Sequence, residues 1–416
     1  MFPVRFPNSR LLQLSAFLGS AGNSAVHVAV PWLVLDITGS SAQAGVVLGL
    51  SGLSVIFTAP IIGGVISVLG PRRVSVWADL ISASSVLLFP LANNTFGLNL
   101  ATLLIIAIYG AMFDPAGNTA RKTLIPRIVA DEKISLTKFN GTFEASAVVG
   151  TIIGFTIGAV LIGAVGVDVT FILLSAIFVA SSVTVLVIRL TATSVHDEKT
   201  FSVENVLDET RTGMKVLWND KPLLSLVGLY TMLSALYMPV ESIILARHFK
   251  DIDQPYALGM ILSAMSLGTV IGALQFHRVI ARLKPPVLVM SSMTGIGLVV
   301  CTMAWLPPAV FFVLLGLILG LSYGPVSPLS NYLVQRRVPS HLHGPVFGTM
   351  FSSTHLAIPI GSLFLGLIIE SVSIPITLLV IGSLFIGVTL IVGIRGPMKN
   401  LTIDSGTNGP SVTDND

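Results

Sequence analysis

The chain has 416 residues, of which 53% are hydrophobic and only 10% are charged, and its mean hydropathy is +0.88. A soluble domain carries roughly 25% charged residues, so this composition excludes an ordinary soluble protein. The net charge of +3 does not indicate a nucleic-acid partner, because the basic residues lie in short segments between apolar runs.

Twelve apolar runs follow one another along the chain, and each is close to the ~20 residues that cross a bilayer as a helix. Within lipid only helices and closed barrels satisfy the backbone hydrogen bonds, and these runs are too long for barrel strands. We therefore predict an all-α polytopic membrane protein. The predicted transmembrane helices are residues 11–36, 42–68, 75–93, 98–116, 140–165, 168–188, 222–246, 255–276, 286–305, 308–330, 343–369 and 373–394.

The Lys and Arg residues form clusters after every second run. Of the 23 Lys and Arg residues, all except Arg247 and Lys250 fall on one side when the runs are threaded through a bilayer. Because basic residues accumulate in cytoplasmic loops, both termini are predicted to be cytoplasmic.

A polar segment at residues 189–221 divides the chain into two predicted six-helix units, 1–188 and 222–395. Apolar residues recur at helical spacing within this segment, which predicts an amphipathic helix on the cytoplasmic membrane surface. The tail at 396–416 is rich in Gly, Ser, Thr, Asn and Asp, and we expect it to be disordered.

The two predicted units resemble each other in sequence. The fourth run ends in YGAMFDPAGNTARKTLIPRIV and the tenth in LGLSYGPVSPLSNYLVQRRVP, which place Pro115 and Pro325 at equivalent positions, each before a basic loop. With six helices on each side of the central segment, this pattern favours duplication of a six-helix unit, the arrangement that transporters use for alternating access.

The loop GGVISVLGPRR between the second and third runs resembles the signature loop of the major facilitator superfamily, Gly-x-x-x-Asp-x-x-Gly followed by basic residues. Ser67 stands where that family has aspartate, and we expect Asp79 in the next helix to be a substitute partner for the two arginines of this loop. The matching positions are Gly63, Gly70, Arg72 and Arg73.

The fifth run resembles the exporter motif of the same family, Gly-x8-Gly-x3-Gly-Pro-x2-Gly-Gly. Phe155 replaces the proline of the motif and Ala159 its last glycine, while Gly141, Gly150, Gly154 and Gly158 match. Small residues at this spacing let two helices approach closely. Together with GNSAVHVAVPWLVLDITGSS and FDPAGNTARKTLIPRIV, the motif makes the chain similar to the branch that contains macrolide and enterobactin exporters. That resemblance implies the major facilitator fold in a bacterial inner membrane.

Ionisable residues within membrane helices suggest function. Three carboxylates near the cytoplasmic ends of the third to fifth helices lie close in sequence to three arginines. The functional interpretation is a cytoplasmic gate of ion pairs, and the alternative is that these groups only anchor helix ends in the headgroup region. The predicted gate residues are Arg72, Arg73, Asp79, Asp114, Arg121 and Glu144.

Glu241 lies in the seventh helix, several residues before its outer end, and is predicted to bind and release the coupling proton with Arg247 and Lys250 as outer-side partners. The alternative is an interfacial carboxylate paired with Arg247 or His248. Two histidines near mid-bilayer, His27 and His355, are further proton-coupling candidates, although a lone buried histidine is more often a packing residue. Asn23, Tyr237 and Met238 are predicted to line the substrate cavity.

The sequence has no Cys/His cluster at metal-ligand spacing, no phosphate-binding Gly-x-x-x-x-Gly-Lys-[Ser/Thr] loop and no Gly-x-Ser-x-Gly elbow. We therefore predict a protein that is not an enzyme and has no metal or cofactor. The leading hypothesis is a monomeric, proton-coupled exporter of a small amphipathic drug, macrolide or siderophore. A lysophospholipid or another metabolite is an alternative cargo. An alternative of another class is a non-transporting receptor or scaffold, which would explain why Ser67 replaces the motif aspartate and Phe155 the motif proline.

Overall fold

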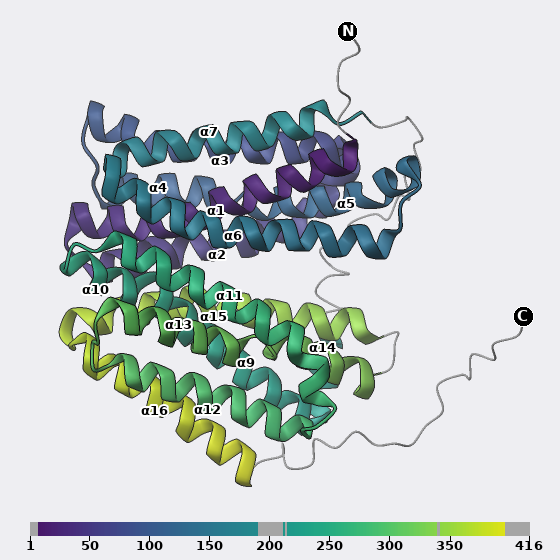
Figure 1. Cartoon of the computed structure of the whole chain (residues 1–416), viewed down its shortest axis with the longest axis vertical. Coiled ribbons are helices and arrows are strands. Elements are labelled where there is room, and N and C mark those ends of the chain that lie inside the picture. Colours follow the sequence, from purple (N-terminus) through teal and green to yellow (C-terminus); the bar gives the residue numbers. More distant parts are fainter. Residues whose placement is uncertain (1–6, 190–210, 213, 339–341, 396–416) are drawn as a thin grey trace, which may run out of the picture.

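The computed structural model describes residues 7–189, 211–212, 214–338 and 342–395, and this part of the chain is helical without a strand. The helices form two bundles that lie side by side, α1 to α7 in one and α9 to α16 in the other (Figure 1). The central segment at 190–210 and the tail at 396–416 lie outside the described residues, as do most of the predicted amphipathic helix and all of the predicted disordered tail.

The first bundle, here the N bundle, contains seven helices because the fourth predicted span is interrupted. The helices are α1 (Asn8–Thr38), α2 (Ser41–Leu69), α3 (Pro71–Thr95), α4 (Leu100–Ala111), α5 (Asp114–Glu132), α6 (Leu136–Val165) and α7 (Val167–Val187).

The second bundle, here the C bundle, has interruptions in its first and fourth spans. Its elements are α9 (Lys221–Pro239), the π-helical η1 (Val240–Leu245), α10 (Ala246–Asp251), α11 (Pro255–Ile280), α12 (Pro285–Met303), α13 (Ala309–Tyr323), α14 (Val326–Arg337), α15 (His343–Ser371), α16 (Ile374–Leu390) and the π-helical η3 (Ile391–Arg395).

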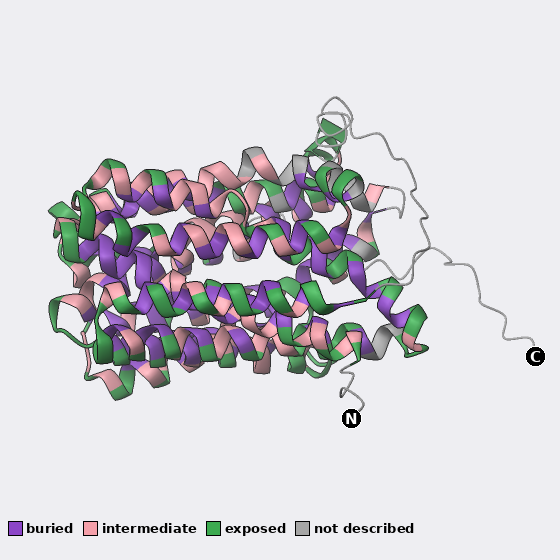
Figure 2. Ribbon diagram, turned by 90° about the horizontal axis from the view of Figure 1, so that it is seen from above, coloured by how far each residue is buried: buried purple, intermediate pink, exposed green. Residues whose placement is uncertain are grey.

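The predicted number of membrane spans agrees with the helices. In the described part, 11 helices are long and apolar enough to cross a membrane, and the shorter apolar stretch Ser41–Val55 belongs to α2, the remaining predicted span. Large apolar side chains on the bundle exterior are exposed, including Trp77 at 61% and Trp305 at 82%, and Figure 2 shows exposed positions along the outward helix faces. Such surfaces require lipid rather than water around them, as expected for a multi-pass membrane protein.

The prediction that Arg121 begins a basic loop is wrong. After a short turn at Met112 and Phe113 the fourth span continues as α5, and Arg121 is buried within that helix. The segment stays helical because Ala116, Ala120 and Leu124 recur at i, i+4 spacing and form a buried apolar face of α5.

The tenth span has the same interruption as the fourth. A turn at Gly324 and Pro325 separates α13 from α14, just as Pro115 opens α5 after the earlier turn. Proline lacks a backbone N–H and breaks the helical ladder, so the sequence repeat corresponds to a structural repeat at these two positions.

Glycines bring several pairs of helices into close contact. A Cβ atom on Gly150 or Gly154 would collide with a backbone carbonyl of α1, and one on Gly158 would lie 2.8 Å from Ala25 Cα. The predicted close approach is therefore present along α6. Gly141 is different, because a Cβ there would meet nothing within 4 Å.

Glycine has another use between α2 and α3. Gly70 lies between the end of α2 and the start of α3. Its φ of 81° is a backbone conformation that residues with a Cβ atom disfavour. Gly63, the other glycine of the predicted signature loop, lies within α2 itself.

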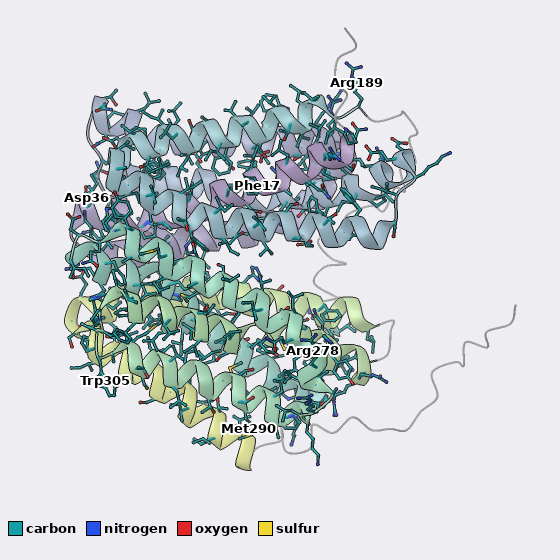
Figure 3. The ribbon with its side chains drawn as sticks, viewed as in Figure 1. Phe17, Asp36, Arg189, Arg278, Met290 and Trp305 are labelled. Carbon is teal, nitrogen blue, oxygen red and sulfur yellow. The ribbon has the colours of Figure 1, made fainter. Side chains whose placement is uncertain are left out.

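The two ends of the molecule differ in charge. Arg189 and Arg278 lie at one end, here called the basic end, and Asp36 and Trp305 lie at the other, here called the Asp36 end (Figure 3). Further arginines begin α3 and end α14 at the basic end. The sequence exceptions Arg247 and Lys250 belong to α10, at the Asp36 end.

Candidate transport site

A buried ion pair lies inside the N bundle. The Arg121 guanidinium pairs with Asp79, with Nη2 2.5 Å from Asp79 Oδ2, and each side chain is only 6% exposed. Arg121 also donates to Ser15 Oγ at 2.7 Å and to Ser181 Oγ at 3.0 Å, and the Ser181 hydroxyl donates to Asp79 at 2.7 Å. Gly19 leaves room for the guanidinium, because a Cβ there would lie 2.9 Å from Nη2.

This cluster joins four helices of one bundle, since its residues come from α1, α3, α5 and α7. Asp79 therefore pairs with Arg121 rather than with Arg72 or Arg73, the arginines of the signature loop that were predicted as its partners. The charges satisfy each other and the serine hydroxyls supply further hydrogen bonds, which is the condition under which a buried ion pair is tolerated.

The other predicted gate residues lie apart from this pair. Arg72 donates to the carbonyl oxygens of Val185 and Leu186 near the end of α7, and Arg73 is exposed at the start of α3. Glu144 forms an exposed ion pair with Lys122 at 2.8 Å. The expected single cluster of six residues is therefore not formed.

Helix geometry explains this separation. Because α5 continues through this segment, consecutive residues point about 100° apart. Arg121 therefore faces α3, whereas its neighbour Lys122 reaches Glu144 on α6. Asp114, at the start of α5, accepts a hydrogen bond from Ser82 at 3.2 Å and faces a cavity.

That cavity, here the N cavity, has a volume of about 210 Å³. It is lined by Asn23 and His27 of α1, Ser82 of α3, Asp114 of α5 and Phe178 of α7, among others. Asn23 and Asp114 are exposed side chains that line this cavity. Asn23 and His27, one helical turn apart on α1, both line this cavity.

His27 contacts an aromatic neighbour. Its ring lies edge-on to Phe155 with centroids 6.0 Å apart, while its Nδ1 atom is buried and has no hydrogen-bond partner among the described residues. Phe155 thus occupies the motif proline's position and contacts α1 through an aromatic ring.

A larger cavity of about 650 Å³, here the C cavity, lies in the C bundle. Ligand pockets commonly measure ~300–1,000 Å³. The predicted residues Met238 and His355 both line the cavity, with Tyr230, Tyr323 and Asn331 among the other lining residues.

Glu241 is linked to the C cavity through two tyrosines. Tyr237 lies one helical turn before Glu241 and stacks on Tyr323, with ring centroids 4.8 Å apart and planes 16° apart. Glu241 lies in η1, which begins immediately after Pro239, and single π-helical turns of this kind are frequent at functional sites. Tyr237, which was predicted to line the cavity, is instead buried and is not among the residues that line it, whereas Tyr323 is.

The predicted outer partners of Glu241 bind elsewhere. Arg247 pairs with Asp251 at 2.9 Å and donates to the Gly39 carbonyl at 2.6 Å, and Lys250 pairs with Asp36. The expected pairing is wrong because Lys250 lies nine residues, about two helical turns, beyond Glu241, and its ammonium reaches Asp36 of α1. Lys250 therefore lies farther out than Glu241. The alternative partner His248 contacts Phe249 and Phe312 instead.

Sequence reasoning missed several residues of these sites, including Ser15, Ser82 and Ser181. A serine within an apolar helix can bond its own backbone, so the sequence does not distinguish these hydroxyls from ordinary ones. The position of Asp36 was more informative. It is an acidic residue at the outer end of the first run, and Lys250 is one of the two basic residues predicted on that same outer side. Among the described residues, no three His, Cys, Asp or Glu side chains are grouped as a metal site requires.

Comparisons with known proteins agree with this architecture. The Major Facilitator Superfamily profile matches residues 12–362. The multidrug efflux pump Tap of Mycolicibacterium fortuitum is 32% identical over 386 residues, which cover 92% of this chain and 94% of that protein. Macrolide efflux protein A of Streptococcus pyogenes is 21% identical over 393 residues, with coverage of 92% and 94%.

A solved structure supports the fold independently. The nucleoside transporter NupG superimposes with a TM-score of 0.75 at 12% identity, covering 95% of this chain and 99% of that one. The resemblance to drug and macrolide exporters is confirmed by the relatives above, and the protein is a membrane transporter rather than an enzyme. The chain belongs to the Major Facilitator Superfamily.

Proposed function

We propose that this chain exports small amphipathic compounds, such as drugs, macrolides or siderophores, in exchange for protons. The observation that carries the proposal is the C cavity of about 650 Å³, whose lining residue Tyr323 stacks on Tyr237, one helical turn before the membrane-embedded carboxylate of Glu241. A drug-sized compound and a proton can therefore act on one connected group of side chains. The efflux activities named for the relatives support the direction of transport.

Contacts between the bundles support alternating access. At the Asp36 end, Lys250 pairs with Asp36, Arg247 donates to the Gly39 carbonyl, and Glu370 accepts from the Ala42 amide at 3.0 Å. Toward the basic end, the facing helices α6 and α11 separate (Figure 1). With the basic end cytoplasmic by the positive-inside rule, this arrangement corresponds to a state open toward the cytoplasm, in which substrate enters before export.

Proton coupling supplies enough free energy for this task. One charge that crosses a potential of about 150 mV releases roughly 3.5 kcal/mol, which supports a gradient of about 300-fold. Glu241 is the proposed carrier, and His27 and His355 are the alternative carriers because each lines one of the two cavities. We further propose a monomer in a bacterial inner membrane with both termini cytoplasmic.

Transport in inside-out vesicles tests the proposal. With a panel of amphipathic dyes, macrolides and siderophores, we expect saturable uptake that a protonophore abolishes and that Glu241→Gln uncouples from the pH gradient. The matched control Glu132→Gln changes the same chemistry at the end of α5, far from the cavities, and should behave like the wild type. Unchanged pH dependence in Glu241→Gln would remove Glu241 from the mechanism. Absence of saturable flux for every compound would favour a receptor or scaffold.

A further inference from the structure

The N cavity holds an unusual carboxylate. Asp114 is exposed within it, and its one hydrogen bond to a described residue comes from the Ser82 hydroxyl at 3.2 Å. The neighbouring carboxylate Asp79 is instead neutralised by Arg121. Asp114 thus brings a negative charge into the bundle without a cationic partner among the described residues.

The rest of the N cavity complements a cation. The side chains that line it include no Lys or Arg, and the other titratable one is His27, whose Nδ1 atom is buried and unpartnered among the described residues. Phe89 and Phe178 are aromatic residues that line the cavity, and aromatic faces attract cations. Asn23 adds an amide that can donate to or accept from a polar group.

We propose that the N cavity binds the protonated amine of a transported compound, with Asp114 as its charged partner and His27 or Asn23 bonded to a second polar group. This inference rests on the proposed export function and adds a specificity-determining residue to it. A volume of about 210 Å³ accommodates an ammonium group with one attached ring or short chain rather than a whole drug-sized molecule. In this proposal the N cavity selects the charge of the compound.

Direct binding to the full-length protein in nanodiscs tests the charge selection. The probes are 2-phenylethylamine, which is protonated at pH 7, and 2-phenylethanol, which has nearly the same size and is neutral. Affinity is measured from the rise of the unfolding midpoint with probe concentration. We expect the amine to bind the wild type at least about tenfold more tightly than the alcohol. Asp114→Asn should lose about tenfold or more in amine affinity, as expected when one member of a desolvated charge pair is removed, with alcohol affinity unchanged.

Three further variants serve as controls for the expected loss of amine binding in Asp114→Asn. Asp131→Asn removes an equal charge at the exposed end of α5 and should bind both probes as the wild type does. Ser82→Ala removes the hydrogen bond to Asp114 but keeps the carboxylate, so amine binding should persist. Asp114→Glu should retain the amine preference, which separates a lost charge from a misfolded variant.

Each result of these binding measurements supports or overturns the proposed role of Asp114. Equal amine affinity in Asp114→Asn and the wild type, or no preference for the amine in the wild type, overturns the inference. If Asp114→Asn binds the amine normally but loses the proton dependence of transport, Asp114 carries a proton rather than the substrate. Because these binding measurements need no proton gradient, they can succeed even if proton coupling fails, and the export function can stand even if they fail.

Discussion

Lys250 and Asp36 form an ion pair that joins α10 of the C bundle to α1 of the N bundle. The Lys250 ammonium also lies 5.0 Å from the centroid of the Trp32 ring. The side chains are 24% and 47% exposed, so this contact is accessible to water and easily reversed. It lies where the bundles must separate if the Asp36 end opens.

We expect Asp36→Asn to shift the population toward the state in which the Asp36 end is open. An exposed ion pair contributes about 0.2–1 kcal/mol, so the shift should be up to about fivefold. Pulsed electron-spin distance measurements between labels at Ile37 and Ile252, which are both exposed, would record it. The exchange of charges in Asp36→Lys with Lys250→Asp should restore the wild-type distribution. An identical distribution in Asp36→Asn would show that the pair does not control opening.

The buried pair of Asp79 and Arg121 should matter far more for stability than for conformational balance. Asp79→Asn leaves the Arg121 charge buried and unpaired, which costs about 3–5 kcal/mol of unfolding free energy. Reversible unfolding in detergent micelles measures this loss. The matched comparison is Glu144→Gln, which breaks an exposed pair with Lys122 and should change the stability by less than about 1 kcal/mol. Similar losses in the two variants would contradict the assigned burial.

Hydropathy was sufficient to predict the membrane spans, because lipid imposes a length and a composition on each helix. It failed at Arg121, where a charged residue continues a helix instead of ending it because its partner lies on another helix. The cavities were only partly predictable. One-turn spacing predicts that Asn23 and His27 share a face of α1, whereas the stacking of Tyr237 on Tyr323 joins side chains from distant parts of the chain, which no local pattern specifies.

The close approach of α1 and α6 predicts a sharp difference between two glycines of one motif. Gly154→Val should destabilise the protein by about 1–3 kcal/mol, because its side chain would press on the backbone of Ala21. Gly141→Ala lies on the same helix in open space and should be neutral or slightly stabilising. Unfolding midpoints of the two variants check this prediction, and equal effects would contradict the helix contact.

The C cavity predicts size selection at Gly348. This glycine lines the cavity, and a Cβ on it would meet nothing within 4 Å, so a larger side chain can enter the cavity without disturbing α15. Gly348→Met should therefore reduce transport of bulky compounds by about tenfold or more, while compounds small enough to share the remaining space lose less. Rates for a series of compounds of increasing size, with unfolding midpoints as a check on folding, measure this effect.

The matched control for that variant is Gly228→Met. Gly228 is exposed on α9, a Cβ on it would also meet nothing within 4 Å, and it is not among the residues that line the C cavity. The two substitutions add the same side chain to a helix, so propensity effects cancel in the comparison. A size-dependent loss in Gly348→Met alone assigns the C cavity to the bulk of the substrate. A uniform loss for all compounds would instead indicate impaired movement of α15, and no loss would place the bulk of the substrate outside the C cavity.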